Sequence, residues 1–200
     1  SGFVAGSVIR QAKEEVELTV WTRGPALLQR DGLIWHTVDP LDEGKARSSF
    51  SDIAPQAVIH LAALADIDYC ESHQAEAEAA NVGVTRRLAS MCAESGTRMV
   101  YVSTDTVFDG ERGNYSEEDP ALPVNFYGRT KLEAEEAVLD LLPGSVVART
   151  SLVVGLPLLG TGNSFLSRTL TALEAGRSVA VTDQEIRSPM DVVTLGQALL

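Results

Sequence analysis

The 200-residue sequence is short of basic residues and of cysteine, and it has no long apolar run. Its 16 Lys and Arg against 28 Asp and Glu give a formal net charge of −12, whereas nucleic-acid-binding proteins cluster basic residues. No apolar stretch reaches the ~18 residues of a membrane span, and no secretory signal pattern is visible. These absences predict a cytoplasmic protein with no nucleic-acid partner and no membrane partner.

Cysteine and histidine are also scarce. Cys70 and Cys92 are too few for a disulfide framework and lack the spacing of metal ligands, so we predict buried free thiols in a reducing compartment. His60 lies inside an apolar run and is interpreted as a core residue. Without a Cys, His or carboxylate cluster at ligand spacing, the sequence predicts no structural metal.

Apolar runs alternate with helical patterns along the chain. The expected strands are residues 16–21, 33–38, 56–63, 98–104 and 145–150. The expected helices are residues 7–15, 75–95, 127–142, 165–175 and 192–200. This order predicts an α/β protein with a Rossmann-type, doubly wound parallel sheet that has helices on both faces.

The ends of the sequence suggest an incomplete pair of domains. We predict a dinucleotide-binding domain at residues 1–150 and the start of an interleaved substrate-binding region at residues 151–200. A dinucleotide site needs a strand before its glycine turn, and none precedes Ser1. We therefore expect a trimmed core of a longer protein, with an incomplete substrate domain.

The first residues predict a pyrophosphate contact. Gly2 and Ala5 fit the second half of a G-x-x-G-x-x-G/A turn, in which backbone N–H groups at a helix start approach a phosphate. Gly2, Phe3 and Val4 are therefore candidate cofactor contacts, although a simple turn is the alternative. Arg23 follows a strand where an arginine accommodates a 2′-phosphate, which favours NADP(H) and leaves NAD(H) open. An exposed strand-end arginine is the other interpretation.

Two further segments follow expected strands at the same edge of the predicted sheet. Asp39 and Leu41 come after the strand at 33–38, where an adenine would lie. Small residues end the next strand and leave room for a cofactor to cross the sheet edge. The candidate contacts there are Ala62, Ala63 and Leu64.

A tyrosine and a lysine carry the candidate chemistry. Tyr127 and Lys131 are four residues apart, on one helical face. A neighbouring ammonium is expected to lower the tyrosine pKa, and the lysine can also bond the nicotinamide ribose, so both are candidate cofactor contacts. Thr104 ends an apolar strand and can hold a substrate carbonyl beside the phenol. We predict Thr104, Tyr127 and Lys131 as the catalytic residues.

Longer segments carry a family resemblance. The runs 101–110, 115–120 and 125–132 resemble extended short-chain dehydrogenase/reductases, and more narrowly their dTDP-4-dehydrorhamnose reductase branch. Residues 58–63, 66–71, 81–82, 148–151, 162–165 and 183–189 continue the match. The resemblance implies NADP(H)-dependent reduction of a keto-sugar nucleotide, with Thr104, Tyr127 and Lys131 as the catalytic trio.

Two residues depart from the family pattern. Thr106 replaces a tyrosine and Leu152 a tryptophan that the resemblance places on the sugar, so the sugar and its nucleotide stay undetermined. A 4,6-dehydratase is disfavoured because Thr106 also replaces the glutamate of its acid/base pair. A nucleotide-sugar epimerase and a non-catalytic NADP-binding regulatory subunit remain alternatives. A homodimer stays open.

The candidate substrate contacts come from several segments. Thr104 and Asp105 lie at the predicted sheet edge, and Asn163 and Phe165 open a later helix. Arg187 suits a nucleotide phosphate, because a guanidinium bonds phosphate in a bidentate manner. A surface arginine is the alternative there.

The cofactor preference can be tested at Arg23. We expect Arg23→Ala to weaken NADPH binding far more than NADH binding, because only NADPH carries the 2′-phosphate. Titration of both cofactors by fluorescence or calorimetry measures the two losses. Equal losses would refute the assignment.

Overall fold

The computed structural model describes residues 2–160, 164–181 and 183–200. Its contacts divide the chain into two compact units. Unit 1 combines residues 1–38 with residues 151–200, and unit 2 is the continuous segment 39–150. The predicted division into a cofactor domain and a substrate region is a functional one and stays a prediction.

Unit 2 is built on a parallel sheet with the strand order β3-β4-β5. Its strands are β3 (Ala57–His60), β4 (Arg98–Thr104) and β5 (Val146–Thr150). The central strand β4 is the most buried, and alternate residues Met99, Tyr101 and Ser103 are each at most 3% exposed. The sheet therefore has its core around β4, and its carboxyl edge is where Thr104 ends the strand.

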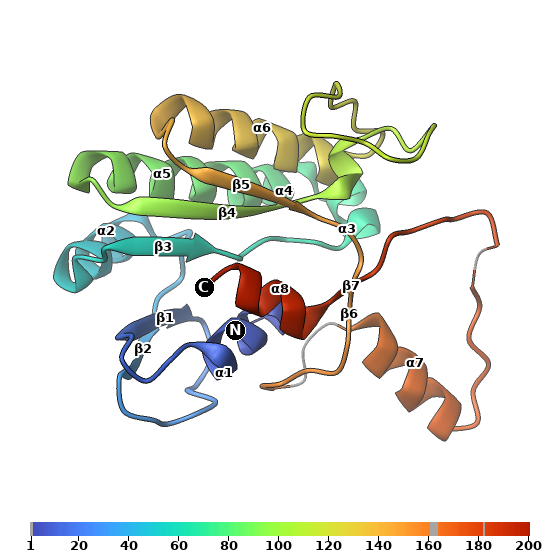
Figure 1. Ribbon diagram of the computed structural model, residues 1–200. Coiled ribbons are helices and arrows are strands. Elements are labelled where there is room, and N and C mark those ends of the chain that lie inside the picture. The colour runs from blue at the N-terminus through green and yellow to red at the C-terminus, as the bar shows by residue number, and fades with distance from the viewer. Residues whose placement is uncertain (1, 161–163, 182) are drawn as a thin grey trace. The chain divides into compact units, whose positions relative to one another are not determined.

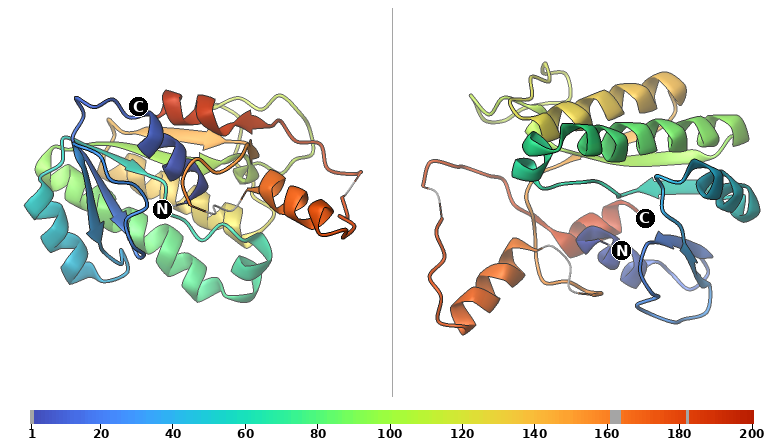
Figure 2. Two further views of the ribbon diagram at one scale, coloured as in Figure 1. Left: turned by 90° about the horizontal axis from the view of Figure 1, so that it is seen from below. Right: turned by 180° about the vertical axis from the view of Figure 1, so that it is seen from behind.

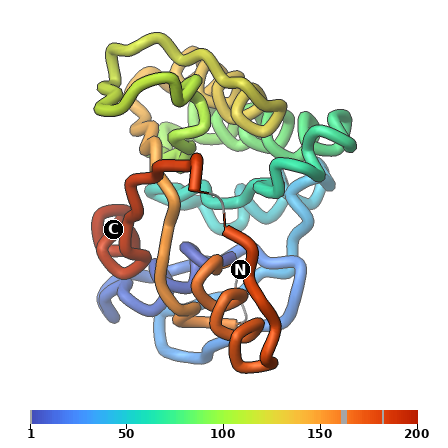
Figure 3. The backbone as a smooth tube through the Cα atoms, turned by 90° about the vertical axis from the view of Figure 1, so that its right-hand side faces the viewer, coloured from blue at the N-terminus to red at the C-terminus, as the bar shows by residue number. Residues whose placement is uncertain are grey.

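Helices cover one face of this sheet. α5 and α6 lie side by side along β4 (Figures 1 and 2). Residues 108–125, yellow-green in Figure 3, form the loop that leads into α6. The helices of unit 2 are α2 (Glu43–Ile53), α3 (Ile67–Ser72), α4 (Gln74–Glu78), the π-helix η1 (Ala79–Gly83), α5 (Val84–Ser95), the 3₁₀ turn η2 (Asp105–Val107) and α6 (Phe126–Leu141).

Unit 1 contains two short parallel pairs of strands. β1 pairs with β2, and β6 pairs with β7. Its elements are α1 (Phe3–Gln11), β1 (Leu18–Thr22), β2 (Leu33–Thr37), β6 (Val153–Val154), α7 (Phe165–Glu174), β7 (Met190–Asp191) and α8 (Val192–Ala198).

The first and last helices of unit 1 pack against each other (Figures 1 and 2). The buried Ser7 hydroxyl donates to the Val192 carbonyl at 2.7 Å. The Gln11 amide donates to Ser7 Oγ at 2.8 Å and to the Val193 carbonyl at 2.9 Å. Gly196 faces this network, since a Cβ there would lie 2.5 Å from Ser7 Oγ. The missing side chain lets the two helices approach.

The α/β class with parallel strands is confirmed. Among the described residues, the strands pair within the sets β1-β2, β3-β4-β5 and β6-β7. The first helix begins at Phe3 rather than residue 7, and β3 ends at His60 rather than residue 63. The expected helix at 75–95 is three consecutive helical elements, and α2, with little apolar periodicity, was not expected.

The α1–α8 contact can be tested at Gly196. A Cβ added in Gly196→Ala would meet both Ser7 Oγ and the Gln11 side-chain nitrogen, 2.6 Å away, so we expect a loss of about 1–3 kcal/mol in the free energy of unfolding. Urea unfolding followed by circular dichroism measures it. Gly24→Ala is the control, because nothing lies within 4 Å of its Cβ position. Equal stability of the two variants would contradict the packing.

Candidate active site

Thr104 stands where β4 ends and the chain turns into η2. Its side chain caps η2 by accepting from the Thr106 amide at 3.2 Å, and its hydroxyl lies 2.9 Å from that of Thr106. It also donates to an Asp105 carboxylate oxygen, at 3.4 Å. Thr104 is 8% exposed, so this hydroxyl is held by neighbours rather than by solvent. Thr106, which departs from the family pattern, helps to orient it.

The start of α6 is capped by two side chains. Asn125 accepts from the Gly128 amide at 2.7 Å. Glu71, in α3, accepts from the Phe126 amide at 2.6 Å. Both oxygens satisfy N–H groups that have no partner within the helix, and the Glu71 charge also suits the helix dipole. These caps fix the turn that carries Tyr127.

Gly128 lets this turn approach the chain after β4. A Cβ on Gly128 would lie 2.3 Å from the Thr106 carbonyl oxygen and 2.9 Å from Pro123 Cβ. The first of these atoms belongs to the backbone and cannot move aside cheaply. The glycine within the Tyr127–Lys131 motif therefore has a packing role that the motif spacing did not indicate.

Tyr127 is half-buried. Burial raises the pKa of Tyr127 to about 12, although the nearby Thr104 side chain lowers it, and the nearby Cys70 and Asp105 raise it further. The expected lowering of the tyrosine pKa by Lys131 is therefore wrong for this structure, because burial outweighs other effects. At neutral pH the phenol keeps its proton.

Lys131 lies one turn further along α6 and is 2% exposed. Its Nζ donates to the Val102 carbonyl at 2.8 Å and lies 4.1 Å from the centroid of the Tyr101 ring. Burial lowers the pKa of Lys131 to about 7, and the Glu135 charge opposes that shift. The lysine is thus a buried base whose charge depends on pH near neutrality.

Asn81, on the π-helix η1, ties this turn to the segment after β3. Its oxygen accepts from the Leu64 amide at 2.8 Å, and its nitrogen donates to the Leu64 carbonyl and to Thr130 Oγ1, each at 3.0 Å. Thr130 in turn donates to the Tyr127 carbonyl at 2.8 Å. Asn81 is 1% exposed. Its role was not predicted, because π-helices leave no clear periodic signal.

The predicted cofactor contacts in unit 2 lie on turns after strands. Asp39 accepts from the Leu41 amide at 3.0 Å, and Leu41 is 49% exposed. Ala62 and Ala63 are exposed, and Leu64 is held through its backbone by Asn81. Their contact with a cofactor stays a prediction.

The predicted contacts in unit 1 surround the start of α1 and the end of β1. Gly2 caps α1, and no atom lies within 4 Å of its Cβ position. Phe3 and Val4 form the first helical turn, which contains no acidic residue. Arg23 directly follows β1 and is exposed. This turn therefore suits an anion.

The remaining predicted substrate contacts have different settings. Phe165 opens α7 and is 42% exposed, and Asn163 lies outside the described residues. The Arg187 guanidinium pairs with Glu185 at 2.8 Å, so a phosphate there would compete with a carboxylate. Arg187 therefore has a partner that the sequence did not indicate.

His60 and the two cysteines lie in the settings that were expected for them. His60 is 4% exposed and lies 2.9 Å from Thr85 Oγ1, and burial lowers its pKa to about 3, which confirms a core residue. Cys70 and Cys92 are buried and free. Among the described residues, no group of three or more potential ligands could hold a metal, and no helix is long and apolar enough to cross a membrane.

Comparison with known proteins gives a family over the whole chain. Residues 1–200 match the family described as RmlD substrate binding domain. The chain belongs to this family. The expected resemblance to extended short-chain dehydrogenase/reductases of the dTDP-4-dehydrorhamnose reductase branch is thereby confirmed.

Relatives of this RmlD-family chain have more than one role. A dTDP-4-dehydrorhamnose reductase of Mycobacterium tuberculosis is 41% identical over 72% of this chain and 48% of its own length. Methionine adenosyltransferase 2 subunit beta of Rattus norvegicus is 33% identical over 75% of this chain and 45% of its own. The chain thus spans about half the length of these curated relatives.

A solved structure supports the fold. MoeE5 in complex with UDP-glucuronic acid and NAD matches with a TM-score of 0.85 and 26% identity, over 99% of this chain and 68% of the other. The Rossmann-like α/β fold of the RmlD-family chain is therefore shown.

The buried Lys131 makes stability depend on pH. Below about pH 7 the lysine is charged in both the folded and the unfolded protein, so the folded state bears the full free-energy cost of burying that charge. Between that value and its ordinary pKa of 10.5, the unfolded state binds more protons, so the free energy of unfolding rises with pH. From about pH 6.5 to 8.5 we expect a steeper rise in the natural protein than in Lys131→Met, by up to about 1.4 kcal/mol per pH unit.

Urea unfolding at a series of pH values measures this difference. Lys45→Met is the matched control, because the Lys45 side chain is 75% exposed. The range stops short of the ordinary thiol pKa of 9.0, above which the buried cysteines also contribute. If the free energy of unfolding of Lys131→Met rose with pH as steeply as that of the natural protein, burial would not lower the pKa of this lysine.

Proposed function

We propose that this chain carries the catalytic centre of an NADP(H)-dependent reductase of keto-sugar nucleotides, with Tyr127 as the proton donor. The observation that carries the proposal is the close approach of the first turn of α6 to the backbone after Thr104, at the carboxyl edge of β4. This turn carries Tyr127, and the buried Lys131 lies one turn further along the helix. In parallel α/β sheets, this edge is where ligands bind.

The protonation of Tyr127 suits reduction. NADPH, when bound, supplies hydride to the carbonyl carbon of a substrate. The Tyr127 phenol, whose pKa of about 12 keeps it protonated, transfers its proton to the carbonyl oxygen and completes the alcohol. Thr104 Oγ1 orients that oxygen by hydrogen bonding. Lys131, charged in part at neutral pH, stabilises the phenolate that remains.

The residues present fit a dinucleotide. The first turn of α1 offers backbone N–H groups behind a glycine with open space at its Cβ position. Arg23, exposed after β1, would hold a 2′-phosphate and favour NADP(H). Because MoeE5 was solved with NAD, NAD(H) remains the alternative. We propose Asp39, Leu41, Ala62, Ala63 and Leu64 as further cofactor contacts.

The substrate class is proposed from relatives and from position. The Mycobacterium tuberculosis relative is named for a 4-keto sugar nucleotide, and MoeE5 was solved with a nucleotide sugar. We propose Thr104, Asp105, Asn163, Phe165 and Arg187 as substrate contacts. The homodimer likewise stays a prediction.

A regulatory role is the second candidate. The rat methionine adenosyltransferase subunit, at 33% identity, favours it. Such a subunit would bind NADP(H) without turnover. The reductase is preferred because Thr104, Tyr127 and Lys131 are all present and buried or half-buried at one sheet edge.

Tyr127→Phe tests the mechanism. We expect the variant to bind NADPH normally and to lose nearly all consumption of NADPH with a panel of 4-keto nucleotide sugars, because it lacks the transferable proton. Tyr115→Phe is the matched control, since its hydroxyl bonds Asp109 in the loop before α6. Retained turnover in Tyr127→Phe would refute the proton donor. No turnover by the natural protein, with tight NADPH binding, would favour the regulatory role.

A further inference from the structure

A third charged residue continues the Tyr127–Lys131 face of α6. Glu135 follows Lys131 by four residues, which places both on one side of the helix. Both side chains are unusually buried for charged groups, at 2% exposed each. Buried charges need partners, so the contacts of each residue show what stabilises it.

The direct contacts of Lys131 supply no negative charge. Its Nζ bonds a neutral carbonyl, that of Val102, and lies over the face of the Tyr101 ring. Both contacts are favourable for an ammonium, but neither replaces a counter-ion. The contacts of Lys131 with β4 therefore leave the charge of its ammonium uncompensated.

Glu135 is held by Arg149 of β5. The Arg149 Nε lies 3.2 and 3.1 Å from the two Glu135 oxygens, and its NH2 nitrogen donates to Oε2 at 2.7 Å. The Arg149 side chain is 24% exposed and lies 5.1 Å from the centroid of the Phe108 ring. This bidentate pair ties α6 to the sheet one turn beyond Lys131.

We propose that Glu135, fixed by Arg149, is a positioning residue for Lys131, supplying the negative charge that keeps the buried ammonium charged one helical turn from Tyr127. The role of this charge in reduction rests on the proposed function. The electrostatic link between Glu135 and Lys131 does not.

Three further titratable groups near Lys131 are neutral near pH 7. Burial lowers the pKa of His60 in β3 to about 3 and raises that of Tyr101 in β4, while the pKa of Tyr127 is about 12. By contrast, Glu135 is negatively charged and Arg149 is positively charged. Removing the Glu135 charge should therefore make Lys131 lose its proton more easily, and removing the Arg149 charge should do the reverse.

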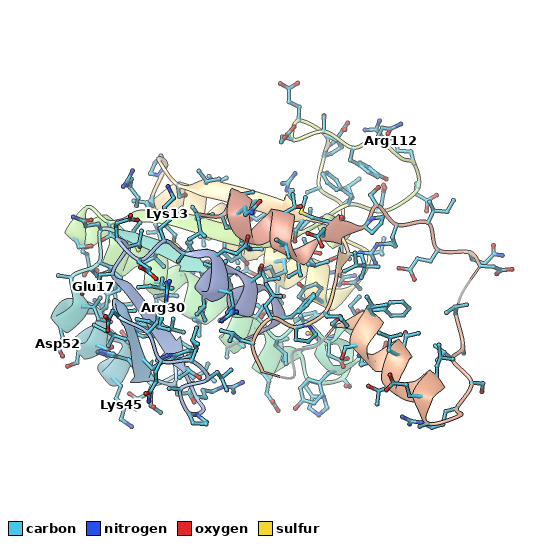
Figure 4. All side chains as sticks on the ribbon, turned by 60° about the horizontal axis from the view of Figure 1, so that its bottom comes forward. Lys13, Glu17, Arg30, Lys45, Asp52 and Arg112 are labelled. Carbon is cyan, nitrogen blue, oxygen red and sulfur yellow. The ribbon has the colours of Figure 1, made fainter. Side chains whose placement is uncertain are left out.

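Lysine NMR tests this link without substrate or cofactor. The sequence has only three lysines, Lys13, Lys45 and Lys131, and the first two are exposed and labelled in Figure 4. In protein labelled with ¹³C at lysine Cε, the Lys131 signal should titrate near pH 7, and its loss in Lys131→Met assigns it. In Glu135→Gln we expect the Lys131 midpoint to fall by about one to two pH units.

Glu136→Gln is the matched control. It makes the same change at the next position of α6, where the side chain is exposed, and should leave the Lys131 midpoint unchanged. Arg149→Met is the second variant and should raise the midpoint, because it leaves Glu135 to act on Lys131 alone. If Glu135→Gln does not fold, Arg149→Met still tests the proposal.

The outcomes separate this proposal from its alternatives. A purely structural ion pair would lower stability in both variants without moving the Lys131 midpoint in opposite directions. An unchanged midpoint, or shifts of equal sign, would overturn the proposal. If the midpoints move as expected but the natural protein reduces no keto-sugar nucleotide, the proposed function fails and the Glu135–Lys131 link stands. If both hold, the pH profile of kcat/KM should shift with the lysine.

Discussion

The first turn of α6 lies against the backbone that follows β4, and the candidate site takes its shape from this contact. Gly128 permits the approach because any side chain would meet the Thr106 carbonyl. Asn125 and Glu71 cap the turn, and Thr130 and Asn81 anchor it to the segment after β3. Thr104 and Tyr127, 23 positions apart in the sequence, are thereby brought close together. The geometry is created by packing, and the chemistry follows from it.

The sequence predicted the parts of this site that depend on regular patterns. The strand at 98–104 was predicted with both ends correct, because an apolar run bounded by polar residues is typical of a buried parallel strand. The spacing of Tyr127 and Lys131 placed both on α6. In contrast, α2 was missed because few of its residues face a core, although Asp42 offered a capping signal.

Tertiary effects explain the remaining differences. The helical pattern at 75–95 hid the π-helix at Ala79–Gly83, since the extra residue per turn depends on how Asn81 is bonded. The pKa of Tyr127 rises chiefly because the side chain is buried, and the degree of burial cannot be read from spacing. The partners Glu135 and Arg149 lie on different elements, so only the fold brings them together. Family membership leaves function open in the same way, since both a reductase and a subunit of methionine adenosyltransferase are relatives.

The packing of α1 on α8 has a consequence for how the chain folds. The bond from Ser7 to Val192 joins residues 185 positions apart, whereas unit 2 is one uninterrupted segment. Contacts between distant residues form slowly, because the closure of a long loop costs entropy first. During synthesis unit 2 can therefore collapse as soon as residue 150 has emerged. Unit 1 must wait for α8, and until then the buried face of α1 is exposed to solvent and to chaperones.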